Sequence, residues 1–515
     1  MLRWWEGRWF VFAAVLLSMV PLLLPAFPPL VDVPGHIGRY HVAAQIAHSA
    51  DLQRHWIFHW QVIGNLGVDL LVMPLQPLFG PVTATKLVIL TIPPLFVTGL
   101  ILLSRACDGR LSPAAPFAFP LAYGFPFQFG FVNFMLSAAL ALLALALWIS
   151  WGKRRRFAAR AIAFVPISCG LWLAHSFGWG MFGLFAFVTE CRRLRKDRTA
   201  WPATVFHAAI ACAPLALPFV LLLAGAGGTG LGVEYHWPLK IFWALSLLRE
   251  KWQAYDIACA VALFALLIFA IRRRRVFRFE PMLGILALTA FATFIALPRL
   301  LLGGAYVDAR ILGIAVALGL IAIRLSDGGA AGTVLAGLAS AFFVMRTVTT
   351  TIALLGFASV QSRALAAIEA IPRGAAVLVI VNEPCGATWS SDRLEHVDGI
   401  AIAKRDIFDN GQWTIAGQQL IAARHPAAGD YRADPSQLAY PPSCEPDTIT
   451  LPEAIRDFDR HTFDYVWTMD FASKPSLAPD VRRIWQNEVS TLYRVERQRE
   501  AVDNPSVAAR LSKAA

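Results

Sequence analysis

The chain begins with an apolar run, WFVFAAVLLSMVPLLLPAF (Trp9–Phe27), and the polar stretch LVDVPGHIGRY (Leu30–Tyr40) follows almost at once. The run has the length that crosses a bilayer, so the stretch after it lies at the membrane surface. A carboxylate placed there can ionise, while the low-dielectric slab beside it raises its basicity. Asp32 is therefore a candidate catalytic base. The alternative is that Asp32 and Pro34 only end a helix and begin a loop.

Composition assigns the chain to the membrane proteins. Of its 515 residues, 57% are hydrophobic and 16% are charged, which is too apolar for a soluble protein. The net charge of +12 does not indicate a nucleic-acid partner, because the Arg and Lys clusters fall between apolar runs as positive-inside loops do. We expect a polytopic protein whose surroundings are the lipid bilayer.

The basic loops mark a regular alternation of spans. Clusters at 105–110, 153–156, 192–198 and 272–278 are predicted to be cytoplasmic. About eleven spans result, with residues 28–64 and 226–253 outside. The expected spans are 9–27, 83–103, 114–130, 132–151, 157–174, 176–191, 202–225, 254–271, 281–298, 308–324 and 331–346. Residues 65–80 are too short and too rich in proline for a span and are predicted to form a juxtamembrane or re-entrant helix.

The outer loop 28–64 is rich in histidine and tryptophan. Five histidines lie in it, at positions 36, 41, 48, 55 and 59. Their spacing repeats no two-ligand motif, so they favour interfacial or structural roles over a metal site.

The composition changes near residue 347. Of the 34 acidic residues, 21 follow position 360, and the long apolar runs stop. Strands are predicted at 375–381, 463–469 and 492–495, and helices at 364–370 and 452–458. We predict a transmembrane domain over 1–358, a small α/β domain outside the membrane over 359–497, and a disordered tail over 498–515. Cys385 and Cys444 are the only cysteines of this α/β domain, which suggests a disulfide.

Three arginines are expected on the same side of the membrane as Asp32. Arg299 and Arg310 bracket the loop 298–310, and Arg346 lies near the outer end of an apolar segment. Any one of them can simply extend to lipid phosphates, but three together suggest a clamp for a bound phosphate. His175 lies in an outer hairpin turn, where a structural role and a part in the site are both open.

This order of features resembles the GT-C superfamily of integral-membrane glycosyltransferases, of the aminoarabinose transferase and protein O-mannosyltransferase type. Asp32, Arg39–Tyr40 and the Ala-rich 42–47 look like the acidic motif and interfacial helix that open the first outer loop in that superfamily. PLQPLFG (Pro74–Gly80) looks like its proline-containing juxtamembrane helix, and Asp308–Arg310 is similar to its late arginine segment. Two departures are Val33, in place of the usual second acid, and Pro74-Leu75-Gln76-Pro77, in place of the usual His-Pro-Pro-Leu.

The resemblance implies a fold and a reaction. The fold would be an α-helical polytopic domain of the GT-C type with a small α/β domain outside the membrane. The reaction would move a sugar from a polyprenyl-phosphate donor to a glycan, lipid or protein acceptor, with inversion and Asp32 as general base. Donor-phosphate contacts would come from Arg310, Arg299 and Arg346, with His36, Arg39 and His175 nearby. Because the second acid is missing, we expect a single-base mechanism without a metal or other cofactor.

The expected location is the bacterial inner membrane, with the C-terminal domain in the periplasm. Two other classes of function stay open. A non-catalytic assembly or polysaccharide-binding protein would keep the outer domain and leave Asp32 dispensable. A secondary transporter would need charged or broken helices at the bilayer midplane and two similar halves, neither of which the sequence shows.

Overall fold

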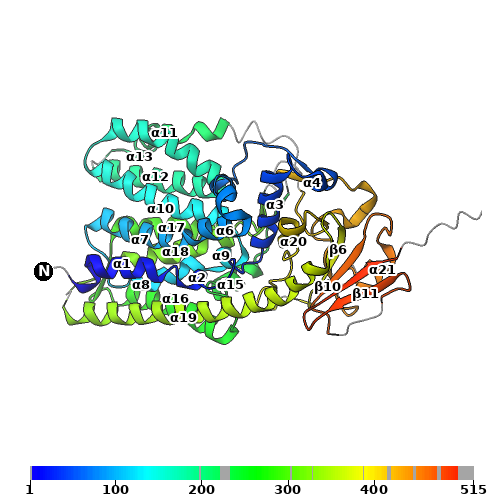
Figure 1. The fold of residues 1–515 in the computed structure, drawn as a ribbon. Helices are drawn as coiled ribbons and strands as arrows, with labels where there is room; N and C mark the ends of the chain where they lie inside the picture. The colour runs from blue at the N-terminus through cyan, green and yellow to red at the C-terminus, as the bar shows by residue number, and fades with distance from the viewer. Residues whose placement is uncertain are drawn as a thin grey trace, which may run out of the picture.

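Two regions of different secondary structure lie side by side in the computed structural model, a bundle of helices and a sheet-containing C-terminal region (Figure 1). The structure describes residues 3–196, 199–220, 232–301, 304–326, 329–386, 388–414, 419–444, 448–472 and 477–496. The N-terminus lies at the end of the bundle away from the sheet (Figure 1). Helix α19 (Ala330–Leu365) runs along the bundle and reaches the C-terminal region, so one helix joins both parts.

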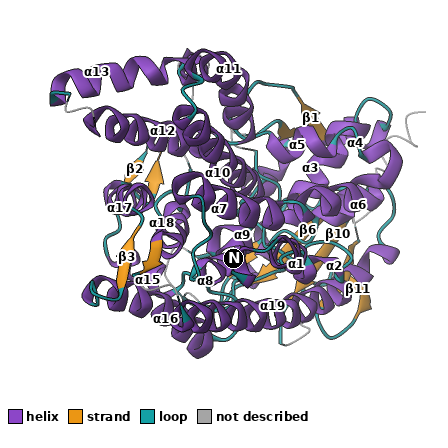
Figure 2. Cartoon of the chain, turned by 90° about the vertical axis from the view of Figure 1, so that its left-hand side faces the viewer, coloured by secondary structure: helices purple, strands orange, loops and turns teal. Residues whose placement is uncertain are grey.

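The bundle is formed by apolar helices of unequal length. Helix α10 packs along α7 at its centre, and α17 packs against α18 (Figure 2). At Gly99 of α7 an added Cβ would lie 2.8 Å from the Cβ of Leu142 in α10, so glycine permits this close approach. The helices of the first half are α1 (Arg8–Leu17), α2 (Val20–Leu23), α3 (Val33–Gln45), α4 (Ala50–His55), α5 (Gly67–Val72), α6 (Gln76–Leu90), α7 (Ile92–Asp108) and α10 (Val132–Lys153). Those of the second half are α11 (Phe157–Ala174), α12 (Ser176–Lys196), α13 (Trp201–Cys212), α15 (Pro238–Leu245), α16 (Gln253–Arg272), α17 (Pro281–Ala296) and α18 (Ala309–Ala322).

Five helices in the described chain are long and apolar enough to cross a membrane. They cover Gln76–Asp108, Val132–Lys153, Phe157–Ala174, Gln253–Arg272 and Ala330–Ala370. Several of the other predicted spans coincide with shorter apolar helices, among them α1, α13, α17 and α18. The chain is thus a multi-pass membrane protein, while the total of about eleven crossings stays a prediction.

The region 114–130 differs from the regular span predicted for it. It forms short helical pieces, α8 (Ala115–Ala118), η2 (Phe119–Tyr123) and α9 (Phe125–Phe129), which are almost wholly buried. Pro116, Pro120 and Pro126 each lack the amide hydrogen that a continuous helix needs, and Gly130 ends the last piece with φ +106°. Hydropathy alone does not register these interruptions, which place backbone next to Asp32.

The C-terminal region is built on a mixed sheet with the strand order β11-β12-β10-β6-β7. Strand β6 (Ala376–Asn382) is central, fully buried along most of its length, and parallel to β10 (Tyr465–Met469), with Tyr465 opposite Val377. This matches the predicted strands at 375–381 and 463–469, because uninterrupted apolar runs are typical of strands buried on both faces. The other strands are β7 (Phe408–Asp409), β9 (Leu438–Ala439), β11 (Val481–Gln486) and β12 (Ser490–Val495). The helices are α20 (Gly399–Arg405) and α21 (Leu451–Asp457).

The C-terminal region contacts residues 28–64, the segment predicted to form an outer loop. Strand β1 (Trp56–Phe58) pairs antiparallel with β8 (Ile421–Ala423). Helices α3 and α20 meet through glycines, because an added Cβ on Gly38 would lie 2.8 Å from the carbonyl oxygen of Gly399. The start of α3, which carries Asp32, is therefore held against the C-terminal region.

Two further features concern the predicted C-terminal domain. Cys385 and Cys444 form a disulfide, with their Cα atoms 5.2 Å apart. Helix α19 continues well beyond the span predicted at 331–346, and the helix predicted at 364–370 is the end of α19 together with η4 (Ala366–Ala370). The tail predicted to be disordered, 498–515, lies outside the described residues.

Candidate active site

Asp32 lies at the first turn of α3 without serving as its cap. The residue precedes the helix, yet its side chain makes no capping hydrogen bond. Its backbone N–H donates to the carbonyl oxygen of Phe129 at 3.0 Å, and its side chain is buried. Gly130 permits this contact, since a Cβ there would lie 2.7 Å from the Asp32 nitrogen. Asp32 thus begins the helix, as the structural alternative expected, but its carboxylate does not cap the helix.

The charges around Asp32 come from two parts of the chain. Burial raises the pKa of Asp32 well above its usual value, and the carboxylates of Glu395 and Asp434 raise it further. Arg310 and Arg393 act in the opposite direction. None of the ion pairs among the described residues includes Asp32. A buried carboxylate with a raised pKa and nearby cations suits a general base.

Arg310, in the first turn of α18, is partly buried and has more N–H donors than the groups around it can accept. Its guanidinium lies over the ring of Phe131 at 4.3 Å, and Nη2 donates to the carbonyl oxygen of Ala305 at 3.1 Å. Nη1 lies 3.1 Å from Nε2 of His175, and Nε has no partner. His175 also accepts the Phe177 N–H on Nδ1, at 3.0 Å. A neutral imidazole has one acceptor nitrogen, so it cannot satisfy both donors. Arg310 is therefore equipped to bind an anion.

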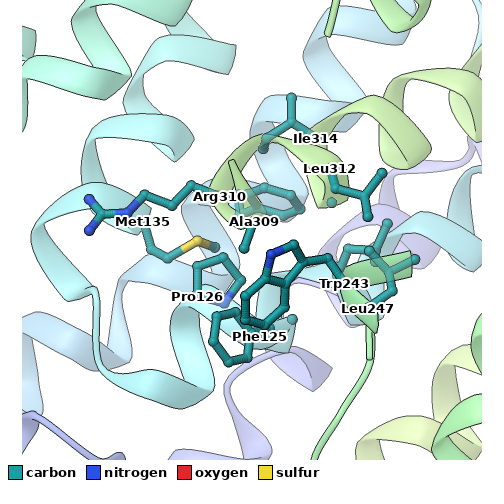
Figure 3. Close-up of a pocket in the computed structure, with 13 residues that line it drawn as sticks. Phe125, Pro126, Met135, Trp243, Leu247, Ala309, Arg310, Leu312 and Ile314 are labelled. Carbon is teal, nitrogen blue, oxygen red and sulfur yellow. The ribbon is translucent and has the colours of Figure 1, made fainter. Parts of the chain in front are cut away.

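A narrow, mostly apolar hollow begins beside Arg310. Its cavity volume is about 20 Å³, room for a water molecule or so, and its lining comes from α7, η2, α9, α10, α15 and α18. Figure 3 shows Phe125, Trp243 and Leu247 gathered below α18, while the guanidinium of Arg310 extends away from them past Met135. Apolar side chains beside a cation suit contact with an amphiphile that carries an anionic group, and a hollow this small has to open to admit one.

His36 and Arg39 lie on α3, one and two turns after Asp32. Burial and the charge of Arg39 lower the pKa of His36, so its ring stays neutral, and its Nδ1 has no partner. The His36 ring packs on Trp413 of the C-terminal region with centroids 5.1 Å apart. Arg39 pairs with Asp69 at 2.8 Å and donates to Gln419 at 2.6 Å. These contacts give Arg39 a structural use, tying α3 to α5 and to the C-terminal region.

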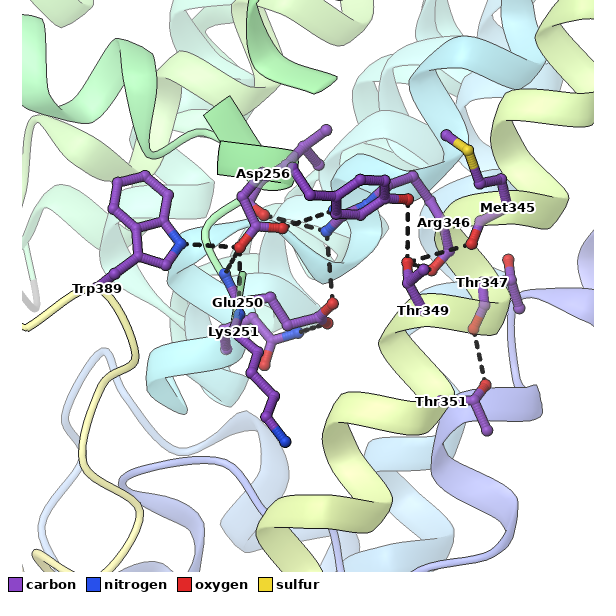
Figure 4. A network of polar contacts seen from close by, with 12 residues as sticks. Glu250, Lys251, Asp256, Met345, Arg346, Thr347, Thr349, Thr351 and Trp389 are labelled. Carbon is purple, nitrogen blue, oxygen red and sulfur yellow. Dashed lines mark hydrogen bonds and ion pairs between the residues drawn. The ribbon is translucent and has the colours of Figure 1, made fainter. Parts of the chain in front are cut away.

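The structure separates the three arginines grouped by the sequence. Arg299 pairs with Glu234 at 3.3 Å and lies over Tyr306 at the edge of the aromatic cluster around Arg310. Arg346 is buried and pairs with Asp256 at 2.7 Å and with Glu250 at 3.6 Å. Figure 4 shows its guanidinium enclosed by these acids, with Lys251 pointing away. Arg310 is the one of the three whose charge acts on Asp32.

Arg393 is a site residue that sequence reasoning missed. It is buried, donates to the backbone and side-chain oxygens of Gln128, and its Nε is without a partner. Gln128 in turn donates to Glu250 at 2.8 Å, which links Arg393 to the Arg346 network. The available signal was the segment SDRLEHVD (Ser391–Asp398), densely charged in a chain that is 16% charged.

Comparison with known proteins supports the fold. No protein-family model and no curated protein matches the sequence. The chain is similar to apo ArnT from Cupriavidus metallidurans, with 12% identity, a TM-score of 0.50 and coverage of 94% of this chain and 97% of ArnT. The structure of that ArnT bound to undecaprenyl phosphate is 13% identical to this chain, with a TM-score of 0.47 and coverage of 94% of this chain and 97% of ArnT. The cryo-EM structure of the arabinofuranosyltransferase AftD from Mycobacteria is 15% identical, with a TM-score of 0.43 and coverage of 96% of this chain and 40% of AftD. The likeness to apo ArnT extends over nearly the whole of both chains, and it confirms that this chain has the GT-C fold implied by the sequence.

Proposed function

We propose that the protein is a glycosyltransferase that moves a sugar from a polyprenyl-phosphate donor to an acceptor hydroxyl at the outer face of the membrane. The observation that carries the proposal is that a buried carboxylate outside every ion pair of the described residues, Asp32, lies within electrostatic reach of a partly buried cation with a spare donor, Arg310. The GT-C fold is consistent with this chemistry. The apolar lining beside Arg310 supports a lipid-linked donor.

The residues divide the reaction between them. The acceptor oxygen attacks the anomeric carbon, and Asp32 takes the hydroxyl proton as the new bond forms. The bond from the anomeric carbon to the phosphate oxygen breaks on the opposite side, which inverts the configuration. Arg310 offsets the charge that grows on the leaving polyprenyl phosphate, and Arg393 adds a second cation near the same centre. Arg299 is placed at the edge of this region, and Arg346 acts only through Glu250 and Gln128.

The outer face is the expected location of this chemistry. The disulfide of Cys385 and Cys444 belongs to an oxidising compartment, which supports placing the C-terminal domain in the periplasm of a bacterial inner-membrane protein. His175 then orients Arg310, and His36 and Arg39 support the Asp32 helix.

Substitutions at the two central residues test the proposal. Asp32→Asn keeps the shape and removes proton acceptance, so release of polyprenyl phosphate from a panel of undecaprenyl-phosphate sugars should fall to background. Binding of undecaprenyl phosphate, measured by native mass spectrometry, should persist in this variant. Arg310→Ala should weaken that binding by about 10- to 100-fold, because a hydrogen bond to a charged group is lost. An Asp32→Asn protein that retains the wild-type rate would contradict the proposal and favour a non-catalytic membrane protein.

A further inference from the structure

A second cluster of polar side chains lies on the part of the C-terminal region that faces Asp32. Glu395, His396 and Asp434 each present one atom of metal-ligand type, and these atoms lie within 4.8 Å of one another. The Nε2 atom of His396 is 3.8 Å from Glu395 Oε1 and 3.9 Å from Asp434 Oδ1. These distances are too long for hydrogen bonds. Two ligands of one tetrahedral zinc ion, each about 2.0–2.2 Å from the metal, lie about 3.3–3.6 Å apart, so a shift of a few tenths of an ångström brings these atoms into range.

The hydrogen bond on the other side of the imidazole fixes its orientation. The Nδ1 atom of His396 is 3.0 Å from the carbonyl oxygen of Gly411. A carbonyl oxygen only accepts, so Nδ1 carries the hydrogen and a neutral ring directs its Nε2 lone pair at the two carboxylates. The side chain is only 3% exposed, and among the described residues Nε2 has no hydrogen bond. With the ring neutral, this lone pair faces two carboxylates, an arrangement that a cation between them stabilises.

Neighbouring groups hold the cluster and add negative charge. Gln437 donates to Asp434 Oδ1 at 2.8 Å, and the ring of Trp413 packs on His396 with centroids 4.2 Å apart. Supporting contacts of this kind orient the ligands in known metal sites. The side chains of Glu395 and Asp434 are 24% and 21% exposed, so both carboxylates are largely removed from water beside His396. Removal of these carboxylates from water, together with their mutual repulsion, favours a bound cation over an empty cluster.

Another histidine–acid pair of the same region shows the contrast. His41 Nε2 lies 2.7 Å from Asp406 Oδ1, a direct hydrogen bond that leaves no room for an ion. Asp406 is also engaged by Ser49 and Arg373. His41 therefore serves as a matched comparison for His396.

We propose that Glu395, His396 and Asp434 bind a divalent transition-metal ion, Zn²⁺ before others. One imidazole and two carboxylates suit zinc, whereas Mg²⁺ and Ca²⁺ prefer oxygen ligands alone. Three protein ligands leave a fourth position open to water or substrate. Glu395 and Asp434 are the carboxylates whose charge acts on Asp32, so an ion bound by them would also act electrostatically on Asp32. A role for it in holding a donor phosphate rests on the proposed function, but the metal site itself does not.

The experiment measures metal binding without any sugar donor. The untagged full chain, purified in detergent and stripped with EDTA, is titrated with Zn²⁺ by calorimetry and with Co²⁺ by visible absorption. One Zn²⁺ per chain is expected, with the d–d bands of a coordinated Co²⁺. His396→Gln and Asp434→Asn should each weaken Zn²⁺ binding by more than the 10- to 100-fold cost typical of losing a supporting contact. His41→Gln, the same substitution in the control pair, should leave the affinity unchanged.

Two results would overturn the metal site. One is a wild-type chain that binds no Zn²⁺, in which case a proton on His396 is the cation between the carboxylates. The other is Zn²⁺ binding that persists unchanged in a folded His396→Gln protein, which would place the ion elsewhere. Circular dichroism and the gel-filtration profile establish that each variant is folded. Since no donor is present, neither result depends on whether Asp32 catalyses sugar transfer.

Discussion

At the scale of single residues, one glycine decides where the Asp32 carboxylate lies. Gly130 has φ +106°, and a Cβ on it would lie 2.7 Å from the Asp32 nitrogen and 2.8 Å from its Cβ. Gly130→Ala should therefore displace Asp32 and abolish sugar transfer, in addition to the roughly 1–2 kcal/mol that a left-handed residue costs. Gly109 has φ +74° with no atom within 4 Å, so Gly109→Ala carries the backbone cost alone. Transfer rates and thermal unfolding of the two variants separate the loss of activity from the loss of stability. Equal transfer rates in Gly130→Ala and Gly109→Ala would contradict a role for Gly130 in positioning Asp32.

The pKa of Asp32 gives a second prediction at this scale. Because burial and the carboxylates of Glu395 and Asp434 raise it, the proton-accepting form is populated only above the usual carboxyl range. The kcat/KM for transfer should thus rise with pH through this raised value. Arg393 lowers the pKa of Asp32, so Arg393→Ala should move the rising limb to higher pH. Arg482→Ala, which removes an exposed pair with Glu496, is the control. A limb that stays in place in Arg393→Ala would exclude this electrostatic link.

At the scale of elements, the contact of α3 with α20 holds the site together. A Cβ on Gly399 would lie 2.7 Å from the Cα of Gly35, and the carbonyl oxygen of Pro34 is nearer still. Gly399→Ala should separate the two helices, which would speed hydrogen exchange in α3 and lower transfer activity. Gly337 of α19 has nothing within 4 Å, so Gly337→Ala should leave exchange in α3 unaltered. If the amides of α3 exchange as slowly in both variants as in the wild type, the contact between α3 and α20 does not position Asp32.

At the scale of the whole molecule, the side of the membrane decides whether the proposed chemistry is feasible. If the C-terminal domain is periplasmic, Cys385 and Cys444 are paired there and are open to reagents from outside. In spheroplasts, a membrane-impermeant maleimide should label the wild type only after reduction. The Cys385→Ser/Cys444→Ser double variant should stay unlabelled, because the five free cysteines lie in or beside the helices of the bundle. Labelling that requires lysis would place the domain inside and contradict the outer-face reaction.

The sequence by itself determined the class of the molecule, many of its helices and the central strands of its sheet. These features follow from hydropathy and periodicity, which are local properties of the chain. The helices α11 and α16 and the strand β6 lie within a residue or so of the predicted bounds for this reason. The interrupted region 114–130 shows the limit, because proline and glycine break the helix there while the apolar average stays high.

Only the tertiary structure decided which charged groups work together. The charge of Arg310 acts on Asp32 across 278 positions of sequence, whereas Arg346, equally apt by composition, is paired with Asp256. Arg393 and the cluster around His396 belong to a separate region of the chain and reach Asp32 because the C-terminal region docks on α3. A side chain's partner depends on the packing of segments far apart in sequence, and no local pattern records it. Asp32 and Arg310 were therefore candidates from the sequence, whereas Arg393, Glu395 and Asp434 were recognised only in the fold.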